Sequence, residues 1–209
     1  MASDNKASHI THVGICGSGI MGSGLAEVFA KAGLQVTVRS RQKATAEAMV
    51  ASIAKGLEKQ VTREKISAAD KDAIMSRLSA TDDIKALANC DLVIESVVED
   101  LAVKKALFAE LDSVVQPNAI LATNTSTLAV VEMAMATKRP DKVCGIHFFN
   151  PAPAMPLVEI VRPLTASDET IEAASAVVAA CGKNGVHVKD RAVLKTLYPE
   201  IAQVGNEWG

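Results

Sequence analysis

Two side chains in the second half of the chain could form an acid–base pair. His147 begins the run 147–151 (HFFNP), directly after an apolar stretch, and Glu159 interrupts the next apolar stretch at 157–161 (LVEIV). A carboxylate inside an apolar strand is costly unless a partner pairs with it, and His147 is the nearest such partner in sequence. A histidine held by a carboxylate has a fixed tautomer and a stabilised imidazolium, so it can act as a general base. A purely structural role for His147 is the alternative. Its pairing with Glu159 beside a hydride-carrying cofactor would favour the role of general base.

A glycine-rich turn near the start of the chain could hold phosphate groups. The run 17–22 (GSGIMG) follows a short apolar stretch at 12–16 and precedes a segment with helical spacing at 23–32. Gly33 stands where a helix stops, and 34–38 predicts a second strand. Alone, this glycine spacing often marks only a flexible turn. Within a strand, turn, helix and strand over about 30 residues, it predicts dinucleotide binding.

The residues of this turn have separate physical roles. Gly17 permits the tight turn, Gly19 lets the backbone approach a pyrophosphate, and Gly22 lets the helix lie close to the strand. The N-terminus of the helix that begins here, with Ile20 and Met21, offers free N–H groups and a positive dipole end to the phosphates.

The end of the second strand bears on the choice between NAD and NADP. An acidic residue at this position accepts hydrogen bonds from the ribose hydroxyls and repels a 2′-phosphate. Here the strand ends with Arg39, Ser40 and Arg41, so the carboxylate is missing and two guanidinium groups flank a hydroxyl. Arginine binds phosphate well, which favours tolerance of, or preference for, NADP. Two solvated arginines at a strand end are the alternative, and the sequence leaves both open.

Repeated alternation of strands and helices predicts the fold. Strands are expected at 79–81, 91–97 and 119–123, and helices at 42–64, 101–115 and from 124–127 through residue 135. The alternation predicts an α/β fold with a doubly wound, mainly parallel sheet of the Rossmann type and helices on both faces. Ligands of such sheets bind at the carboxyl ends of the strands. Glu99 and Ser126 each follow a strand, so both should line that crevice, although Ser126 could instead, or also, cap a helix.

Composition excludes several classes of protein. The 209 residues are 49% hydrophobic with a net charge of −2, so nothing indicates a nucleic-acid or membrane partner. The first eight residues are polar, and no apolar run reaches the roughly 20 residues of a membrane span. The four cysteines are scattered, which predicts buried free thiols and a cytoplasmic location, and no metal-ligand cluster is visible.

Four stretches together resemble the NAD-binding domain of the short-chain 3-hydroxyacyl-CoA dehydrogenases, the 3-hydroxybutyryl-CoA dehydrogenase group. They are 17–24 (GSGIMGSG), 93–100 (VIESVVED), 124–128 (NTSTL) and 147–155 (HFFNPAPAM), and the resemblance runs from about His12 to Asp190. It implies reversible oxidation of a 3-hydroxyacyl-CoA to a 3-ketoacyl-CoA with NAD or NADP, a reaction of fatty acid metabolism.

The resemblance also implies roles for single residues. His147 would take the hydroxyl proton as hydride leaves C3 of the substrate for the nicotinamide. Glu159 would orient His147 and stabilise its charged form, and Ser126 would hydrogen-bond the substrate oxygen. Positions that contact the cofactor in the family are matched by Glu99, Lys104 and Asn150.

Two features depart from the family pattern. The family usually has an acidic residue where Ser40 stands, and after Asp190 it continues into an all-helical domain that this chain does not match. We therefore expect a dinucleotide-binding domain at 1–190 and an atypical tail at 191–209, with weak or no dehydrogenase activity of this chain alone. A non-catalytic dinucleotide-binding module is the alternative. The family dimerises through the helical domain, so this chain is expected to be monomeric or to associate through exposed apolar surface.

Overall fold

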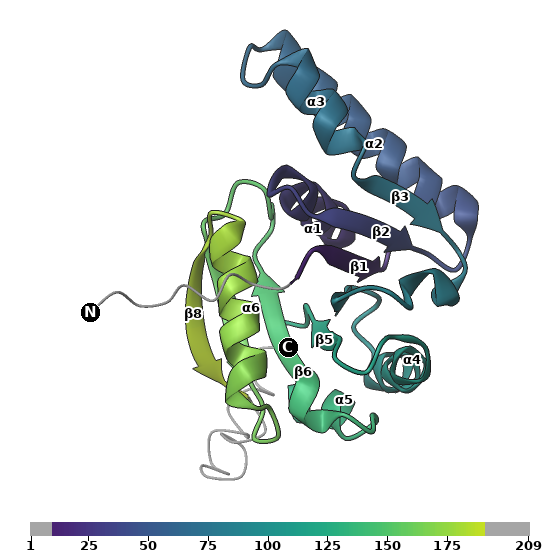
Figure 1. Ribbon diagram of the computed structural model, residues 1–209, viewed down its shortest axis with the longest axis vertical. Coiled ribbons are helices and arrows are strands. Elements are labelled where there is room, and N and C mark those ends of the chain that lie inside the picture. Colours follow the sequence, from purple (N-terminus) through teal and green to yellow (C-terminus); the bar gives the residue numbers. More distant parts are fainter. Residues whose placement is uncertain (1–9, 191–209) are drawn as a thin grey trace, which may run out of the picture.

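The computed structural model describes residues 10–190 and shows an eight-stranded sheet with helices on both faces (Figure 1). The strands are β1 (His12–Cys16), β2 (Gln35–Arg39), β3 (Leu78–Thr81), β4 (Leu92–Glu95), β5 (Ile120–Thr123), β6 (Val143–Phe148), β7 (Leu157–Arg162) and β8 (Asn184–Lys189). The α-helices are α1 (Ile20–Lys31), α2 (Lys43–Thr62), α3 (Ala68–Met75), α4 (Leu101–Val114), α5 (Val130–Ala134) and α6 (Asp168–Ala180). Two short 3₁₀ helices are η1 (Ile84–Leu87) and η2 (Pro140–Lys142).

The order of the strands creates the crevice that the sequence predicts. The order across the sheet is β3-β2-β1-β4-β5-β6-β7-β8. The pairs from β3 to β6 are all parallel, β7 runs antiparallel to β6, and β8 is parallel to β7. The chain moves outward in one direction from β1 to β3 and then returns to β4 on the other side of β1. Such a reversal opens a ligand-binding crevice at the carboxyl ends of the two central strands.

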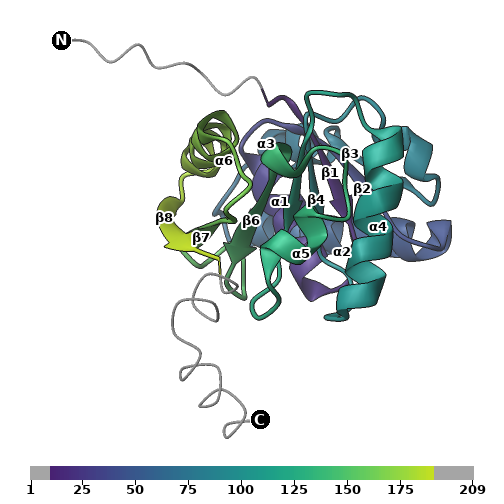
Figure 2. The same ribbon diagram turned by 90° about the horizontal axis from the view of Figure 1, so that it is seen from below.

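Two apolar layers hold the helices on the sheet. Helices α1, α2 and α6 cover one face, and α4 and α5 cover the other, as Figure 2 shows. Alternate residues of β1 point into different layers, because successive side chains of a strand face opposite sides: Ile15 belongs to the first layer and Cys16 to the second. The strands are apolar on both faces for this reason, as expected for a parallel sheet covered on both sides.

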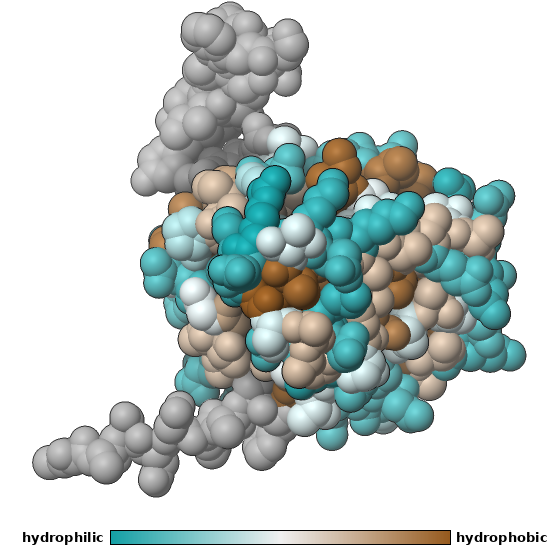
Figure 3. Space-filling view, turned by 90° about the horizontal axis from the view of Figure 1, so that it is seen from above, coloured by the Kyte–Doolittle hydropathy of each residue, from teal (hydrophilic) through white to brown (hydrophobic). Residues whose placement is uncertain are grey.

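The predicted helix at 42–64 is confirmed as α2, and it forms a hairpin with α3 at one end of the molecule (Figure 1). Ser67 caps α3, since its hydroxyl accepts from the Asp70 N–H while the Asp70 carboxylate accepts from the Ser67 N–H. The surface seen from this side is mostly hydrophilic, with hydrophobic groups in separate patches between polar side chains (Figure 3). None of the helices in the described part of the chain has the length and hydrophobicity needed to cross a membrane.

The predicted start of one helix is wrong. The segment 124–127 does not open a helix; α5 begins only at Val130 and ends at Ala134, and its N-cap residue is Ala129. Ser126 therefore caps no helix. The N–H groups of Val130 and Val131 instead donate to the buried carboxylate of Asp190, at 3.0 and 2.8 Å. This cap comes from a residue about 60 positions away, so local sequence contains no sign of it.

Candidate active site

The glycine turn lies between β1 and α1, at the carboxyl end of β1 (Figure 1). Gly17 has φ +124°, and a Cβ there would lie 2.2 Å from the Ser96 carbonyl oxygen. A Cβ on Gly22 would lie 2.2 Å from the Gly17 carbonyl oxygen. Both positions therefore require glycine on steric grounds, and Gly22 allows close packing of α1 on the turn as well as on β1.

Gly19 differs from these two glycines. A Cβ added to it would meet no atom of the described chain within 4 Å, and its φ of −77° suits any residue. Gly19 is also the N-cap of α1, where the described chain supplies no side chain to cap the helix. Open space in front of an uncapped helix N-terminus is what an approaching phosphate group needs.

A cavity of about 1060 Å³ opens in front of this turn. Nearly all of the predicted site residues line it. They are Gly17, Gly19, Ile20, Met21, Arg39, Ser40, Arg41, Glu99, Lys104, Ser126, His147 and Asn150. The two predicted residues that do not line it are Gly22, which packs against the turn, and Glu159. Glu159 pairs with His147 and borders a smaller adjoining cavity of about 210 Å³.

His147 and Glu159 pair as predicted. They are directly opposite each other in the antiparallel β6–β7 pair, and the His147 Nδ1 lies 2.9 Å from the Glu159 Oε2. A carboxylate can only accept, so Nδ1 carries the proton and Nε2 remains the basic nitrogen. The side chain of His147 is 14% exposed and that of Glu159 is 35% exposed. The imidazole also stacks at a tilt on Phe149, with 4.6 Å between ring centroids.

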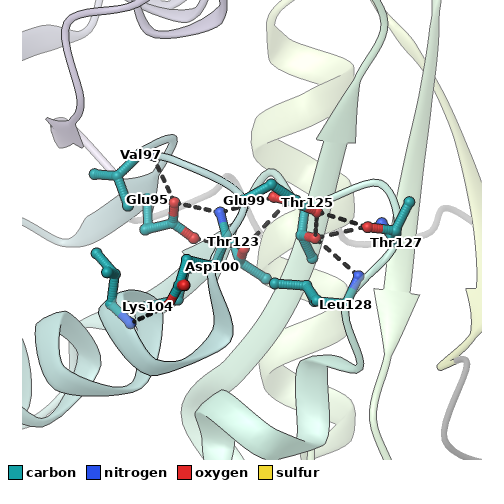
Figure 4. A network of polar contacts seen from close by, with 10 residues as sticks. Glu95, Val97, Glu99, Asp100, Lys104, Thr123, Thr125, Thr127 and Leu128 are labelled. Atoms are coloured by element: carbon teal, nitrogen blue, oxygen red, sulfur yellow. Dashed lines mark hydrogen bonds and ion pairs between the residues drawn. The ribbon is translucent and has the colours of Figure 1, made fainter.

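A partly buried ionic network lies at the ends of β4 and β5 (Figure 4). The Lys104 ammonium lies 2.6 Å from the Glu95 Oε1 and 3.1 Å from the Glu99 Oε2. Glu95 is fully buried, and it also accepts from the Val97 N–H at 2.6 Å and from the Thr123 hydroxyl at 2.7 Å. These contacts fasten α4 to the ends of β4 and β5.

Glu99 connects this network to the loop that carries Ser126. Its carboxylate accepts from the hydroxyls of Thr125 and Thr127 as well as from Lys104. Burial favours the neutral carboxyl, but the hydrogen bond from Thr125 and the positive charge and hydrogen bond of Lys104 outweigh it, so the pKa of Glu99 lies below its ordinary value. Glu99 therefore remains a carboxylate at neutral pH.

Sequence reasoning missed part of the cavity wall. The missed residues lie at or after the ends of strands, or on one face of α4, and without coordinates they look like ordinary core or loop positions. They are Ser18, Ser96, Val97, Val98, Val103, Ala106, Leu107, Glu110, Asn124, Phe148 and Phe149. Val98 and Val103 are 62% and 45% exposed, and Ile20 is 78% exposed, so the cavity has apolar wall area free to contact a ligand.

The structure also places the four cysteines and the side chains that could bind a metal ion. Cys16, Cys90 and Cys144 are buried and Cys181 is partly exposed, and all four are free thiols, as predicted. Burial raises the pKa of Cys16 and of Cys144 to about 12. Within residues 10–190 no cluster of three or more His, Cys, Asp or Glu side chains is arranged to hold a metal ion.

The fold and the cavity define a dinucleotide-binding α/β domain whose cavity is lined by a histidine that pairs with a carboxylate. The chain belongs to the family described as "3-hydroxyacyl-CoA dehydrogenase, NAD binding domain", whose model matches residues 12–191. This family implies an NAD(H) cofactor, and the open space at Gly19 in front of the helix N-terminus fits a pyrophosphate.

Known proteins support the same assignment. The chain is 46% identical over 187 residues to a 3-hydroxybutyryl-CoA dehydrogenase of Mycobacterium tuberculosis, an alignment that covers 87% of this chain and 64% of the relative. The crystal structure of 3-hydroxybutyryl-CoA dehydrogenase from Escherichia coli K12 matches with a TM-score of 0.85 and 40% identity, covering 87% of this chain and 38% of that one. (S)-3-hydroxybutyryl-CoA dehydrogenase PaaH1 from Ralstonia eutropha matches with a TM-score of 0.85 and 34% identity, covering 96% of this chain and 73% of that one. The chain thus spans less than two thirds of the length of the Mycobacterium tuberculosis relative.

Proposed function

We propose that the chain forms the cofactor-binding and proton-transferring part of an oxidoreductase. The reaction is the interconversion of a 3-hydroxyacyl-CoA, such as 3-hydroxybutyryl-CoA, and the 3-ketoacyl-CoA with a nicotinamide cofactor. The observation that carries the proposal is that His147, paired with Glu159, lines the same cavity as the glycine turn. The names of the relatives supply the substrate class.

The proposed chemistry assigns each side chain one task. The bound nicotinamide supplies the acceptor for the hydride that leaves C3 of the substrate. His147 takes the hydroxyl proton at Nε2, because Nδ1–H is held by Glu159. Glu159 fixes the imidazole and stabilises its protonated form, and Ser126 donates a hydrogen bond to the substrate oxygen. A placed general base contributes about 10²–10⁴ in rate.

Three further residues are proposed to position the cofactor. Glu99 and Lys104 line the cavity at one end of the buried network, and Asn150 lines it directly after the segment of His147. Lys104 is only 1% exposed, so its role is to fix the cavity wall and Glu99 as much as to contact the cofactor itself.

The dinucleotide site can be tested with a matched pair of glycine variants. Gly19→Ala adds a methyl group into open space, so the protein should fold normally, but the methyl group would occupy the place proposed for the pyrophosphate. Gly56→Ala in α2 also adds a methyl group into open space, away from the cavity. NADH titration followed by fluorescence should show at least about tenfold weaker binding for Gly19→Ala and no change for Gly56→Ala. Equal affinities for the two variants would contradict the site.

Catalysis is tested separately from binding. The 209-residue chain is assayed for oxidation of NADH with acetoacetyl-CoA, and His147→Gln is compared with the parent at equal cofactor saturation. The proposal expects the rate to fall about 10²–10⁴-fold while the NADH Kd is unchanged. Because weak or no activity of this chain alone is expected, turnover of the parent chain at a rate normal for enzymes would contradict that expectation. Turnover that is unaffected by His147→Gln would remove the proposed base.

Other properties of the chain are proposed on more general grounds. Four free cysteines support a reducing, cytoplasmic compartment. Met135 and Leu164 are 67% and 82% exposed, which supports association through apolar surface, while the net charge of −2 supports neither a nucleic-acid nor a membrane partner. The predicted boundary between a domain at 1–190 and a tail at 191–209 remains a prediction, because the tail lies outside the described residues.

A further inference from the structure

The end of β2 forms the wall of the cavity beside the glycine turn. Arg39 is paired with Cys16 of β1 in the parallel register, and its carbonyl oxygen accepts from the Gly17 N–H at 3.0 Å. Arg39, Ser40 and Arg41 all line the cavity. In this type of fold the residue about 20 positions beyond the turn faces the adenosine ribose. This segment is therefore fixed where the 2′ position of the ribose would lie.

The wall at this point is made of hydroxyls and guanidinium groups. The Ser18 and Ser40 hydroxyl oxygens lie 3.1 Å apart and share a hydrogen bond. The carboxylates among the lining residues are Glu99 and Glu110, which belong to the segments after β4. Glu99 is already engaged by Lys104. A ribose hydroxyl thus has no carboxylate of the β2 end to bind, and a phosphate has none to repel it.

The two arginines carry charge that their surroundings do not neutralise. The Nε of Arg39 donates to the backbone carbonyl of Asp82 at 3.4 Å, which is an uncharged acceptor. Within the described chain neither Arg39 nor Arg41 forms an ion pair, whereas Arg139 and Arg162 each pair with an aspartate. Two guanidinium groups without ion pairs at the edge of a cavity attract a dianion, and their geometry suits phosphate oxygens.

We propose that this site accepts the 2′-phosphate of NADP(H), with Arg39 and Arg41 as its ligands, and binds NADP(H) more tightly than NAD(H). The inference deepens the proposed function and rests on the dinucleotide site described above. Ser40 is the residue that determines this preference, because its small hydroxyl leaves room for a phosphate that a carboxylate would repel.

The test is a pair of fluorescence titrations of the 209-residue chain with NADPH and NADH. NADPH should bind at least about tenfold more tightly, and the ratio should fall with added salt. Competition with adenosine 2′,5′-bisphosphate and with ADP isolates the 2′-phosphate from the nicotinamide end: the bisphosphate should displace NADPH at the lower concentration.

Variants show whether the wall residues are responsible. Arg41→Ala should weaken NADPH at least about fivefold and leave NADH within about twofold. Ser40→Asp should weaken NADPH at least about tenfold without weakening NADH. Arg63→Ala is the matched control, because Arg63 is exposed after the end of α2 and lies outside the cavity. It should change neither affinity.

The outcomes separate this inference from the function on which it rests. If NADH binds, NADPH binds no more tightly, and Arg41→Ala affects both equally, the phosphate subsite is wrong and the dinucleotide site stands. If neither cofactor binds, the inference and the proposed function both fail.

Discussion

The buried lysine of α4 offers a sharp test of how the site is held together. Lys104 is 1% exposed and Glu95 is fully buried, and their charged atoms lie 2.6 Å apart. Replacing Lys104 by Met keeps a long unbranched side chain with similar helix propensity but removes the ammonium. Glu95 would then be a buried carboxylate without its cation.

The expected cost follows from that burial. Breaking a buried ion pair by removing one partner costs about 3–5 kcal/mol, because an uncompensated charge remains inside the protein. This is a large share of the roughly 5–15 kcal/mol that stabilises a typical domain. The neighbouring Lys105 is a matched control: it is 42% exposed and lies 3.1 Å from Glu132, which is 49% exposed. Lys105→Met should cost about 1 kcal/mol or less.

The assay is equilibrium unfolding in urea without cofactor, with the free energy of unfolding of each variant compared with the parent. A second variant separates charge from packing. Glu95→Gln in the Lys104→Met background removes the stranded charge, so it should recover at least half of the lost stability. The reasoning is refuted if Lys104→Met and Lys105→Met cost the same, or if the double variant is no more stable than Lys104→Met alone.

Three further predictions concern other parts of the molecule. Burial raises the pKa of Asp91, but hydrogen bonds from Thr11 and other donors outweigh it, and the pKa lies below its usual value. The stabilisation that the Asp91 carboxylate provides is then present above about pH 4 and is lost as the pH falls through its pKa in the folded protein. Asp91→Asn should therefore lower the thermal stability clearly at pH 7 and less below about pH 4. An equal loss at both pH values would contradict this. Lys183 donates to three backbone carbonyls of residues 152–155 at 2.8–3.0 Å. Lys183→Met should therefore lower the free energy of unfolding by about 1–2 kcal/mol. No loss of stability in urea unfolding would show that water replaces the ammonium. Burial raises the pKa of Cys181 to about 12, as it does for the fully buried Cys144. A thiol reagent at pH 8 should therefore modify the native protein slowly, with Cys181 reacting first and all four thiols reacting only after unfolding. Rapid reaction of the native protein would count against the burial of these thiols.

Local sequence predicted the elements well where short-range rules control them. The glycine turn was predictable from the local glycine spacing between a strand and a helix, and a Cβ on Gly22 would clash with Gly17 only five residues earlier. The Ser67 cap of α3 is a local feature as well, because both partners of the capping box lie within four residues. In contrast, α6 and β8 were not assigned from the pattern, although Ser167 also caps its helix locally.

The start of α5 was wrong for a different reason. Thr125 is followed by a turn in which its hydroxyl accepts from the N–H groups of Thr127 and Leu128, and this competes with helix formation. The helix begins at Val130 because Asp190 satisfies its first N–H groups. Neither the competing turn nor the distant cap is visible in a periodicity of apolar residues.

By itself the sequence determined which chemical groups are present and which local structures carry them: a glycine turn before a helix, a histidine after an apolar stretch, and two arginines on either side of a serine that stands where an acidic residue is usual. The tertiary structure decided which of those groups meet. Reversal of β7 puts Glu159 opposite His147, and the crossing from β3 to β4 places the turn, Arg39 and Glu99 around one cavity. Contacts of this kind depend on the order and direction of strands, which arise from packing the whole sheet and are absent from any short stretch of residues.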